Sequence, residues 1–192
     1  MRKKITIPET IEDITLGQYQ NFISNTDMKV QIFTGLTKKE IDGISQKDLD
    51  YLNNQIDIAL NSQSIFKQRF ILNNIEFGMI PNFDKITSKE YFDLSSYGVD
   101  IDTLHNVMAI AFRPIKDKGK TYTIENYNGT EEYAETMKQM PLNYVNGFLS
   151  FFLTLQDDLL NYIQKYTTEA QAMEYQHQII LKNGVGMLPS MN

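Results

Sequence analysis

The segment RFILNNIEFGMIPNFDKITSKEYFDL, residues 69–94, decides the fold class because a strand pattern is followed directly by a helix start. Apolar residues alternate on both sides of Asn73-Asn74, which predicts two antiparallel strands joined by a type I′ turn. Pro81 is expected to end the second strand, because proline has no N–H group to donate to a strand ladder. The motif TSKE, from Thr87 to Glu90, then predicts the start of a helix.

The helix-start motif of residues 87–90 occurs twice more, as TLGQ from Thr15 and as TKKE from Thr37. In such a motif the threonine hydroxyl accepts a hydrogen bond from a helical N–H, and the Glu or Gln side chain accepts one from the threonine N–H. A fourth start, GTEEY at Thr130, instead places acids in the first turn, where they complement the helix dipole. Four starts predict a largely helical chain, with helices at about 16–25, 29–34, from 38, 45–63, from 87, 103–112, 131–140 and 142–166.

A second strand region is predicted in KGKTYTIENYNGTEE, with a turn at Asn128-Gly129. The predicted fold class is therefore α+β and predominantly helical, with small antiparallel hairpins at about 69–80 and 121–127 packed on a helical core. Pro114 is expected to end the helix at 103–112, and Arg113 to cap the last carbonyl groups of that helix. Residues 1–166 are expected to form a single globular helix-rich domain, and residues 167–192 a helical extension with a flexible C-terminal tail.

Composition restricts the partners that we expect. The chain has 192 residues, 42% hydrophobic, and a formal net charge of -6, so it can bury one core but would repel a phosphate backbone. Nucleic acid is thus a disfavoured partner. The absence of cysteine excludes disulfides and thiolate chemistry. The longest apolar run, residues 144–155, is too short to span a bilayer, and no signal peptide is visible, so no membrane partner is expected.

Catalytic and metal-binding motifs are weak in this sequence. His105 and His177 lie far apart in the sequence, and neither has a second ligand at a motif spacing such as HExxH. Asp100 and Asp102 precede His105 and could pair with its imidazole, but a hydrogen-bonded structural histidine is the favoured interpretation. We therefore predict no catalytic residue, no metal ligand and no cofactor, and expect that the protein is not an enzyme.

Three further segments favour structural explanations. Asp157 and Asp158 are adjacent, so on a helix their carboxylates would point in different directions. The NGVGM segment near the C-terminus lacks the strand and helix that a phosphate-binding loop requires, and GxSxG, GxxxxGK[ST] and GxGxxG motifs are absent. The NGT segment at 128–130 fits a hairpin turn better than a glycosylation site.

Several segments, in order along the chain, resemble a family from the structural-gene blocks of tailed bacteriophages, including crAss-like phages and relatives. The resembling segments are ITIPETIEDITLGQYQNF, IFTGLTKKEI, RFILNNIEFGMIPNFDKIT, YFDL, LHNVMAIAFRPI, YTIENYNGTEEYAETMKQMPL and GFLSFFLTLQDDLL. They extend to about residue 166, and no catalytic residue is carried over with them.

The resemblance implies a tail assembly chaperone-like or minor virion protein that acts by protein–protein contacts, without catalysis. The implied partners are other phage structural proteins, namely tape-measure, tail or portal components, and a homo-oligomer stays open. The implied location is the bacterial host cytoplasm during assembly, with the mature virion as a further option. The alternatives are a small hydrolytic or nucleic-acid-modifying enzyme that uses His105 with nearby acids, and a DNA-end or packaging factor, which the charge balance disfavours.

Overall fold

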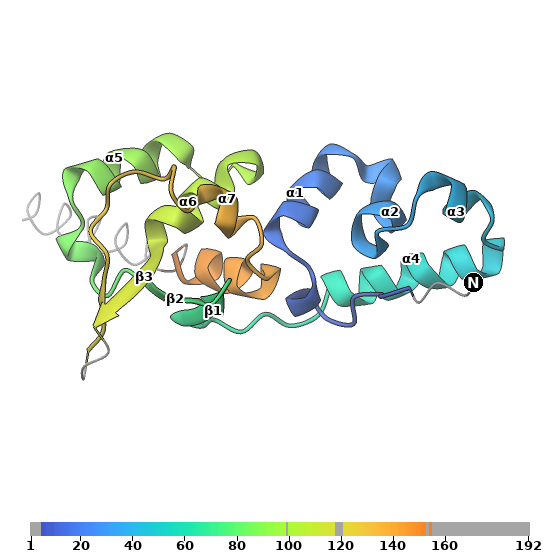
Figure 1. Ribbon diagram of the computed structural model, residues 1–192, viewed down its shortest axis with the longest axis horizontal. Coiled ribbons are helices and arrows are strands. Elements are labelled where there is room, and N and C mark those ends of the chain that lie inside the picture. Colours follow the sequence, from blue (N-terminus) through green and yellow to red (C-terminus); the bar gives the residue numbers. More distant parts are fainter. Residues whose placement is uncertain (1–4, 99, 118–120, 153, 155–192) are drawn as a thin grey trace, which may run out of the picture. The chain divides into compact units, whose positions relative to one another are not determined.

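The computed structural model describes residues 5–98, 100–117, 121–152 and 154, with the side chain of Asp84 left out (Figure 1). The chain divides into two compact units, Met1–Phe148 and Leu149–Asn192, and the architecture below is that of the first unit. The predicted domain boundary after residue 166, and the predicted helix end there, lie outside the described residues. The described part confirms the predicted class: an α+β fold that is predominantly helical.

The first four helices follow the predicted positions closely. They are α1 (Leu16–Ser24), α2 (Lys29–Thr34), α3 (Lys38–Asp42) and α4 (Gln46–Leu60). The capping boxes at Thr15 and Thr37 are confirmed. Each threonine hydroxyl accepts the backbone N–H of the residue three positions later, and the side chain of that residue accepts the backbone N–H of the threonine. α2 packs against both α1 and α4, and α4 buries Leu52, Ile56 and Ala59. Short 3-10 turns lie at Ile11–Asp13, Thr26–Met28, Phe83–Lys85 and Ile101–Thr103.

The sheet has four antiparallel strands in the order β1-β2-β3-β4. β1 (Arg69–Leu72) and β2 (Ile75–Met79) form the hairpin that the sequence predicts. Its turn residues Asn73 and Asn74 have φ values of 49° and 66°. A type I′ turn requires positive φ at both central residues, so the predicted turn type is confirmed.

β3 (Phe112–Asp117) was not expected, because a proline lies inside it. α6 (Leu104–Ala111) continues into β3 without a linker, so Arg113 lies on a strand and does not cap the helix as predicted. The carbonyl of Pro114 accepts the N–H of Glu125, so the nitrogen of Pro114 also faces β4. Because it faces away from β2, the missing N–H group removes no hydrogen bond from the β2–β3 ladder. β4 is only Thr123–Ile124, so the second predicted hairpin, at about 121–127, is instead a β3–β4 pair.

Three further helices and one helical segment complete the described part of the first unit. α5 (Ser88–Tyr97) begins at the predicted Thr87 capping box, and α6 packs against both α5 and α7 (Ala134–Met137) (Figure 1). α7 begins later and ends earlier than the predicted 131–140, because residues 131–133 and 138–139 form turns. The core is centred on aromatic side chains that the sheet and the helical residues 142–148 bury together: Phe70, Phe77, Phe112 and Phe148.

Backbone hydrogen bonds join the start of α1 to the segment before the helical residues 142–148. Leu16 N donates to Met140 O at 2.9 Å, and Leu142 N donates to Ile14 O at 2.7 Å. Gly17 N donates to Lys138 O at 2.7 Å, which continues the same ladder. The α1–α4 helices are thereby attached to the part of the first unit that contains the sheet.

Candidate functional site: a pocket beside Arg113

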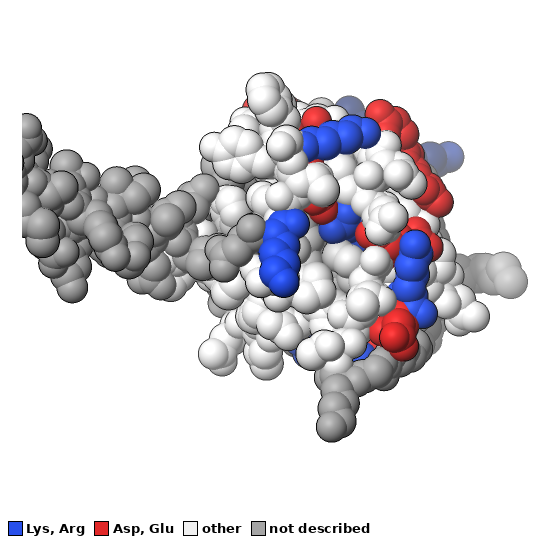
Figure 2. Space-filling view, turned by 90° about the vertical axis from the view of Figure 1, so that its left-hand side faces the viewer, with Lys and Arg blue, Asp and Glu red and all other residues white. Residues whose placement is uncertain are grey.

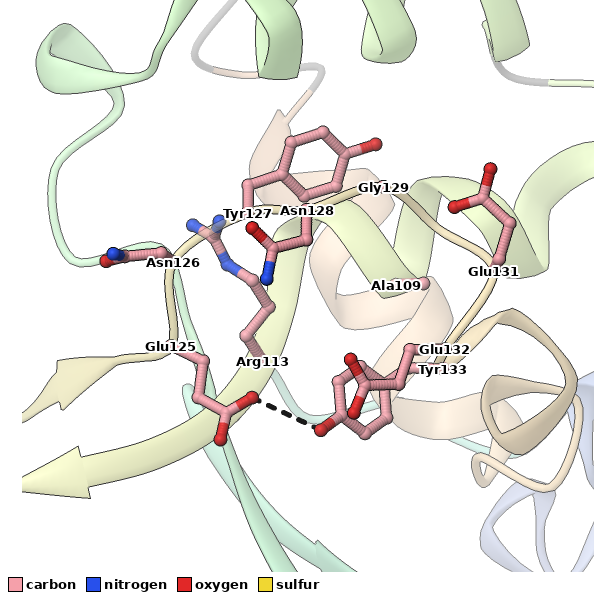
Figure 3. Close-up of a pocket in the computed structure, with 10 residues that line it drawn as sticks. All are labelled: Ala109, Arg113, Glu125, Asn126, Tyr127, Asn128, Gly129, Glu131, Glu132 and Tyr133. Atoms are coloured by element: carbon pink, nitrogen blue, oxygen red, sulfur yellow. Dashed lines mark hydrogen bonds between the residues drawn. The ribbon is translucent and has the colours of Figure 1, made fainter.

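A pocket of about 180 Å³ lies beside β3, where the segment 125–133 returns from β4 to α7 (Figure 3). Figure 3 shows this segment running around the pocket, with Arg113 rising from β3 inside the ring and Ala109 contributed by α6. Segment 125–133 supplies the other lining residues: Glu125, Asn126, Tyr127, Asn128, Gly129, Glu131, Glu132 and Tyr133. Ligand pockets for drug-sized molecules span about 300–1,000 Å³. This one therefore suits a single side chain or a similarly small group.

Arg113 forms a buried ion pair. Its Nη2 lies 2.6 Å from Oε1 of Glu90, and the two residues are only 7% and 4% exposed. The other carboxylate oxygen of Glu90 accepts the N–H of Thr87, so one side chain completes the α5 capping box and neutralises Arg113. Burial by itself raises the pKa of Glu90, but the Thr87 hydrogen bonds and the Arg113 charge together lower the pKa below its usual value. The sequence indicated only the capping role of Glu90, because its ion pair spans two distant segments.

One nitrogen of Arg113 has no acceptor. Its Nε is buried and makes no hydrogen bond with any residue that the structure describes. Leaving a buried donor without an acceptor costs about 1–3 kcal/mol, and more when the group is charged. Arg113 therefore has one unsatisfied donor, but this nitrogen has almost no accessible surface through which a ligand in the pocket could contact it.

Tyr127 fixes segment 125–133 to α5. Its hydroxyl donates to Oδ2 of Asp93 at 2.6 Å, and the cationic groups of Lys89 and Arg113 lie 5.3 and 5.6 Å from its ring centroid. Lys89 Nζ also donates to the carbonyl of Asn128 at 2.9 Å. Burial, followed by the bond to Asp93, raises the pKa of Tyr127 far above its usual value, so this hydroxyl stays a donor. The wall formed by Tyr127 and Asn128 is thus held in place from α5.

The Tyr133 hydroxyl on the opposite side of the pocket is bonded to one glutamate and lies within the electrostatic influence of a second. Tyr133 donates to Oε2 of Glu125 at 3.2 Å, and its pKa is raised, first by burial and then by hydrogen bonding and charge from Glu132 and Glu125. A phenol has one proton to donate, and the Tyr133 proton goes to Glu125. Neither glutamate forms an ion pair within the described residues. This side of the pocket therefore has an excess of acceptors and of negative charge.

His105, the residue behind the predicted enzymatic alternative, lies elsewhere and contacts an amide. Its Nδ1 is 3.1 Å from Nε2 of Gln20, and the same Gln20 nitrogen donates to the carbonyl of Ile101 at 2.6 Å. Burial, followed by the Lys138 charge, lowers the pKa of His105, which favours the neutral imidazole at neutral pH. Within the described residues no hydrogen bond joins the carboxylate of Asp100 or of Asp102 to this imidazole, and the Asp102 contact is a backbone hydrogen bond that raises the pKa of His105. Asp100 instead accepts the backbone N–H of Asp102.

The other sequence candidates are not brought into a site. His177, Asp157, Asp158 and the NGVGM segment lie outside the described residues. The NGT segment is not the predicted hairpin turn: Gly129 has a φ of +128°, and Thr130 is buried with its hydroxyl 3.3 Å from that of Tyr97. The signal for the pocket was present in the sequence as the clustered acids and tyrosines of residues 125–133. Nothing in the sequence, however, placed them around Arg113.

Three other kinds of site, for a metal ion, a bilayer or a nucleic acid, find little support in the described residues. Within the described residues no group of three or more His, Cys, Asp or Glu side chains is arranged to hold a metal ion. In the part of the chain that is described, none of the helices is both long and apolar enough to cross a bilayer. Figure 2 shows basic and acidic side chains interspersed on one face, whereas a phosphate backbone would favour a continuous basic surface.

Comparisons of the chain with protein-family models, with curated proteins and with solved structures found no match.

Proposed function

We propose that this protein is a tailed-phage morphogenesis or virion protein that acts through protein–protein contacts and carries out no catalysis. Its partners would be tape-measure, tail or portal proteins, which it would meet in the bacterial host cytoplasm during assembly. As an assembly chaperone it would cover apolar segments of a partner until the tail forms. As a minor virion protein it would stay in the particle.

The observation that carries this proposal is the exposure of two consecutive aromatic side chains on α5, which project from the helix about 100° apart. Tyr91 is 63% exposed and Phe92 is 72% exposed. Aromatic residues bury a large area at a contact and are enriched in the cores of protein interfaces. α5 presents them rigidly, because its first turn is held by the capping box of Thr87 and Glu90 and by Arg113. A fixed helix with two exposed rings is suited to docking against another protein.

Two further observations support contacts rather than chemistry. The sequence resemblance to phage structural-block proteins follows the order of the chain up to about residue 166. In addition, the single histidine among the described residues bonds to Gln20, and burial together with the Lys138 charge lowers its pKa despite the nearby Glu135 carboxylate. No contact of His105 favours the alternative function, an enzyme that uses this histidine.

Mass spectrometry of purified phage particles separates the two versions of the proposal. Peptides of this protein in mature particles, at a fixed ratio to tail or portal proteins, would establish a virion component. Their absence from particles, with recovery of the protein bound to a tail or tape-measure protein in infected cells, would establish a chaperone. Absence from both would contradict the proposed function.

A paired substitution tests the contribution of α5. Tyr91→Ser with Phe92→Ser should reduce recovery of the phage structural partner about tenfold or more, because interface aromatics often contribute 2 kcal/mol or more each. The matched control is Tyr51→Ser with Ile58→Ser on α4, where the side chains are 58% and 53% exposed. Co-purification of tagged protein from infected cells, with thermal melting to show that both variants fold, gives the comparison. Equal losses in the two pairs would remove α5 as the docking element.

A further inference from the structure

Two Asn-Gly pairs lie in the part of the chain that the structure describes, and their backbones differ. Asn128-Gly129 lies in a loop between β4 and α7, whereas Asn146-Gly147 lies within the helical residues 142–148. A third pair, Asn183-Gly184, is outside the described residues. Such pairs are chemically labile in a flexible chain, because glycine has no side chain to shield its backbone nitrogen from the asparagine side chain. The structure therefore distinguishes which described pair can react.

The reaction is the loss of ammonia from the asparagine side chain. The backbone nitrogen of the glycine gives up its proton to hydroxide or water and attacks Cγ of the asparagine. A bond forms between this nitrogen and Cγ, the bond from Cγ to the side-chain nitrogen breaks, and that nitrogen takes a proton from water and leaves as ammonia. Water then opens the succinimide ring to give aspartate or isoaspartate. The net change replaces ammonia by water, without oxidation or reduction.

At Asn128 the groups that must react are accessible. Its side chain is exposed and lines the pocket, and Figure 3 shows it extending into the ring that segment 125–133 forms. Within the described residues, neither this side chain nor the N–H of Gly129 makes a hydrogen bond. Gly129 has a φ of +128°, which residues with a side chain rarely adopt. Ring closure at this position therefore breaks no hydrogen bond of the described structure.

Lys89 stabilises the charge that develops during the attack. Its Nζ donates to the carbonyl oxygen of Asn128 at 2.9 Å. That oxygen and the nitrogen of Gly129 belong to one resonant peptide group, so loss of the proton spreads negative charge onto the oxygen. An ammonium donor placed at this oxygen stabilises the anion. The Glu131 carboxylate lies against Gly129 and opposes this effect, but no hydrogen bond joins it to the peptide group in the described structure.

The same pair at Asn146 is held against reaction. Inside a helix each N–H donates to the carbonyl four residues earlier, so the nitrogen of Gly147 is engaged. Gly147 is also buried, and a Cβ atom built on it would lie 2.8 Å from Cα of Phe66. Attack on Cγ of Asn146 therefore requires this packed helix to open first.

We propose that Asn128 is a site of spontaneous deamidation in the folded protein, with the nitrogen of Gly129 as the nucleophile and Lys89 as the group that stabilises its anion. Each event adds one negative charge to the pocket wall, and the isoaspartate product also lengthens the main chain by a methylene group. Lys89 and Tyr127 hold this wall to α5, so the product alters the segment that supports α5. The inference goes beyond the proposed function and does not depend on it.

The test follows the full chain during incubation at physiological temperature and mildly alkaline pH. Peptide mapping by mass spectrometry measures deamidation at each Asn-Gly pair separately. In the native protein we expect Asn128 to react at least about tenfold faster than Asn146, equivalent to roughly 1.4 kcal/mol in activation free energy. In urea the two rates should converge, because the structure that separates them is lost. Equal rates in the native protein, or a difference that persists in urea, would overturn the proposal.

Variants test the contribution of Lys89. Lys89→Gln should slow the reaction at Asn128 about threefold, because the charged donor at the peptide oxygen is lost. Lys47→Gln on α4 changes the net charge equally at a position that does not line the pocket and should leave the rate unchanged. Thermal melting shows that both variants fold. An equal effect of the two substitutions, or a faster reaction in Lys89→Gln, would remove Lys89 from the mechanism.

Discussion

At the scale of single residues, Glu90 connects more of the structure than any sequence motif suggested. One carboxylate oxygen caps the first turn of α5, and the other pairs with Arg113 on β3. Replacing one member of a buried ion pair leaves the other charge without compensation, which is more costly than losing an exposed pair. α5, β3 and the pocket wall therefore all depend on this one side chain.

Glu90→Gln should lower the free energy of unfolding by about 3 kcal/mol at neutral pH, within the range for breaking a buried pair. The pKa of Glu90 is lowered in the folded protein, so its contribution is fully present above the pKa of the unfolded chain. That contribution is lost as the pH falls through the lower, folded value. Urea unfolding from neutral to acidic pH should therefore show the variant converging toward the native protein in acid.

Glu135→Gln is a matched control for this prediction. Glu135 also forms an ion pair at 2.6 Å, with Lys138, but at the surface of α7, where solvent screens the charges. Little change in stability is expected at any pH. A loss as large as that of Glu90→Gln would show that the Arg113 pair has no special weight.

At the scale of elements, local signals predicted what local contacts determine. The three capping boxes and the Asn73-Asn74 turn depend on residues within four positions of one another, and all are present in the structure. The sequence did not predict β3, because a proline that follows an apolar helical pattern indicates the end of a helix. The orientation that makes Pro114 acceptable in a strand depends on its hydrogen bond with Glu125, eleven residues later. The Gln20–His105 and Glu90–Arg113 pairs were missed for the same reason: their partners are far apart in the sequence.

The β1–β2 turn offers a prediction that isolates backbone conformation. Asn74 has a φ of 66°, and its exposed side chain makes no hydrogen bond within the described residues. Asn74→Ala should lower the free energy of unfolding by about 1 kcal/mol, because alanine is disfavoured in the left-handed region. Asn74→Gly should equal or exceed the native stability, because Asn-Gly is the preferred type I′ pair. Denaturant unfolding of both variants tests this, and equal losses in both would argue against the turn type.

At the scale of the whole first unit, the backbone ladder between residues 14–17 and 138–142 controls cooperativity. Through it the α1–α4 helices share hydrogen bonds with the segment that leads into the buried Val145 and Phe148. Ile14 and Leu16 are themselves fully buried beside this ladder. Opening the ladder would expose both sets of side chains together, so the first unit should unfold as one cooperative body.

Native-state hydrogen exchange tests this cooperativity. The amides of Leu16, Gly17 and Leu142, which donate across the ladder, should exchange with the same opening free energy, close to that of global unfolding. Amides of the exposed segment 125–128 that lack such bonds should exchange much faster. Exchange of Leu16 and Gly17 at lower free energy than Leu142 would show that α1–α4 opens independently.

The ladder also has a consequence for synthesis on the ribosome. Ile14 and Leu16 leave the exit tunnel long before Met140 and Leu142, so the partners that complete their backbone hydrogen bonds do not yet exist. Until then the side chains of residues 14 and 16 stay exposed, as in other folds that are closed by contacts between distant parts of the chain. A nascent chain of this protein is therefore most vulnerable to aggregation and proteolysis from the emergence of residue 14 until residue 142 has left the tunnel.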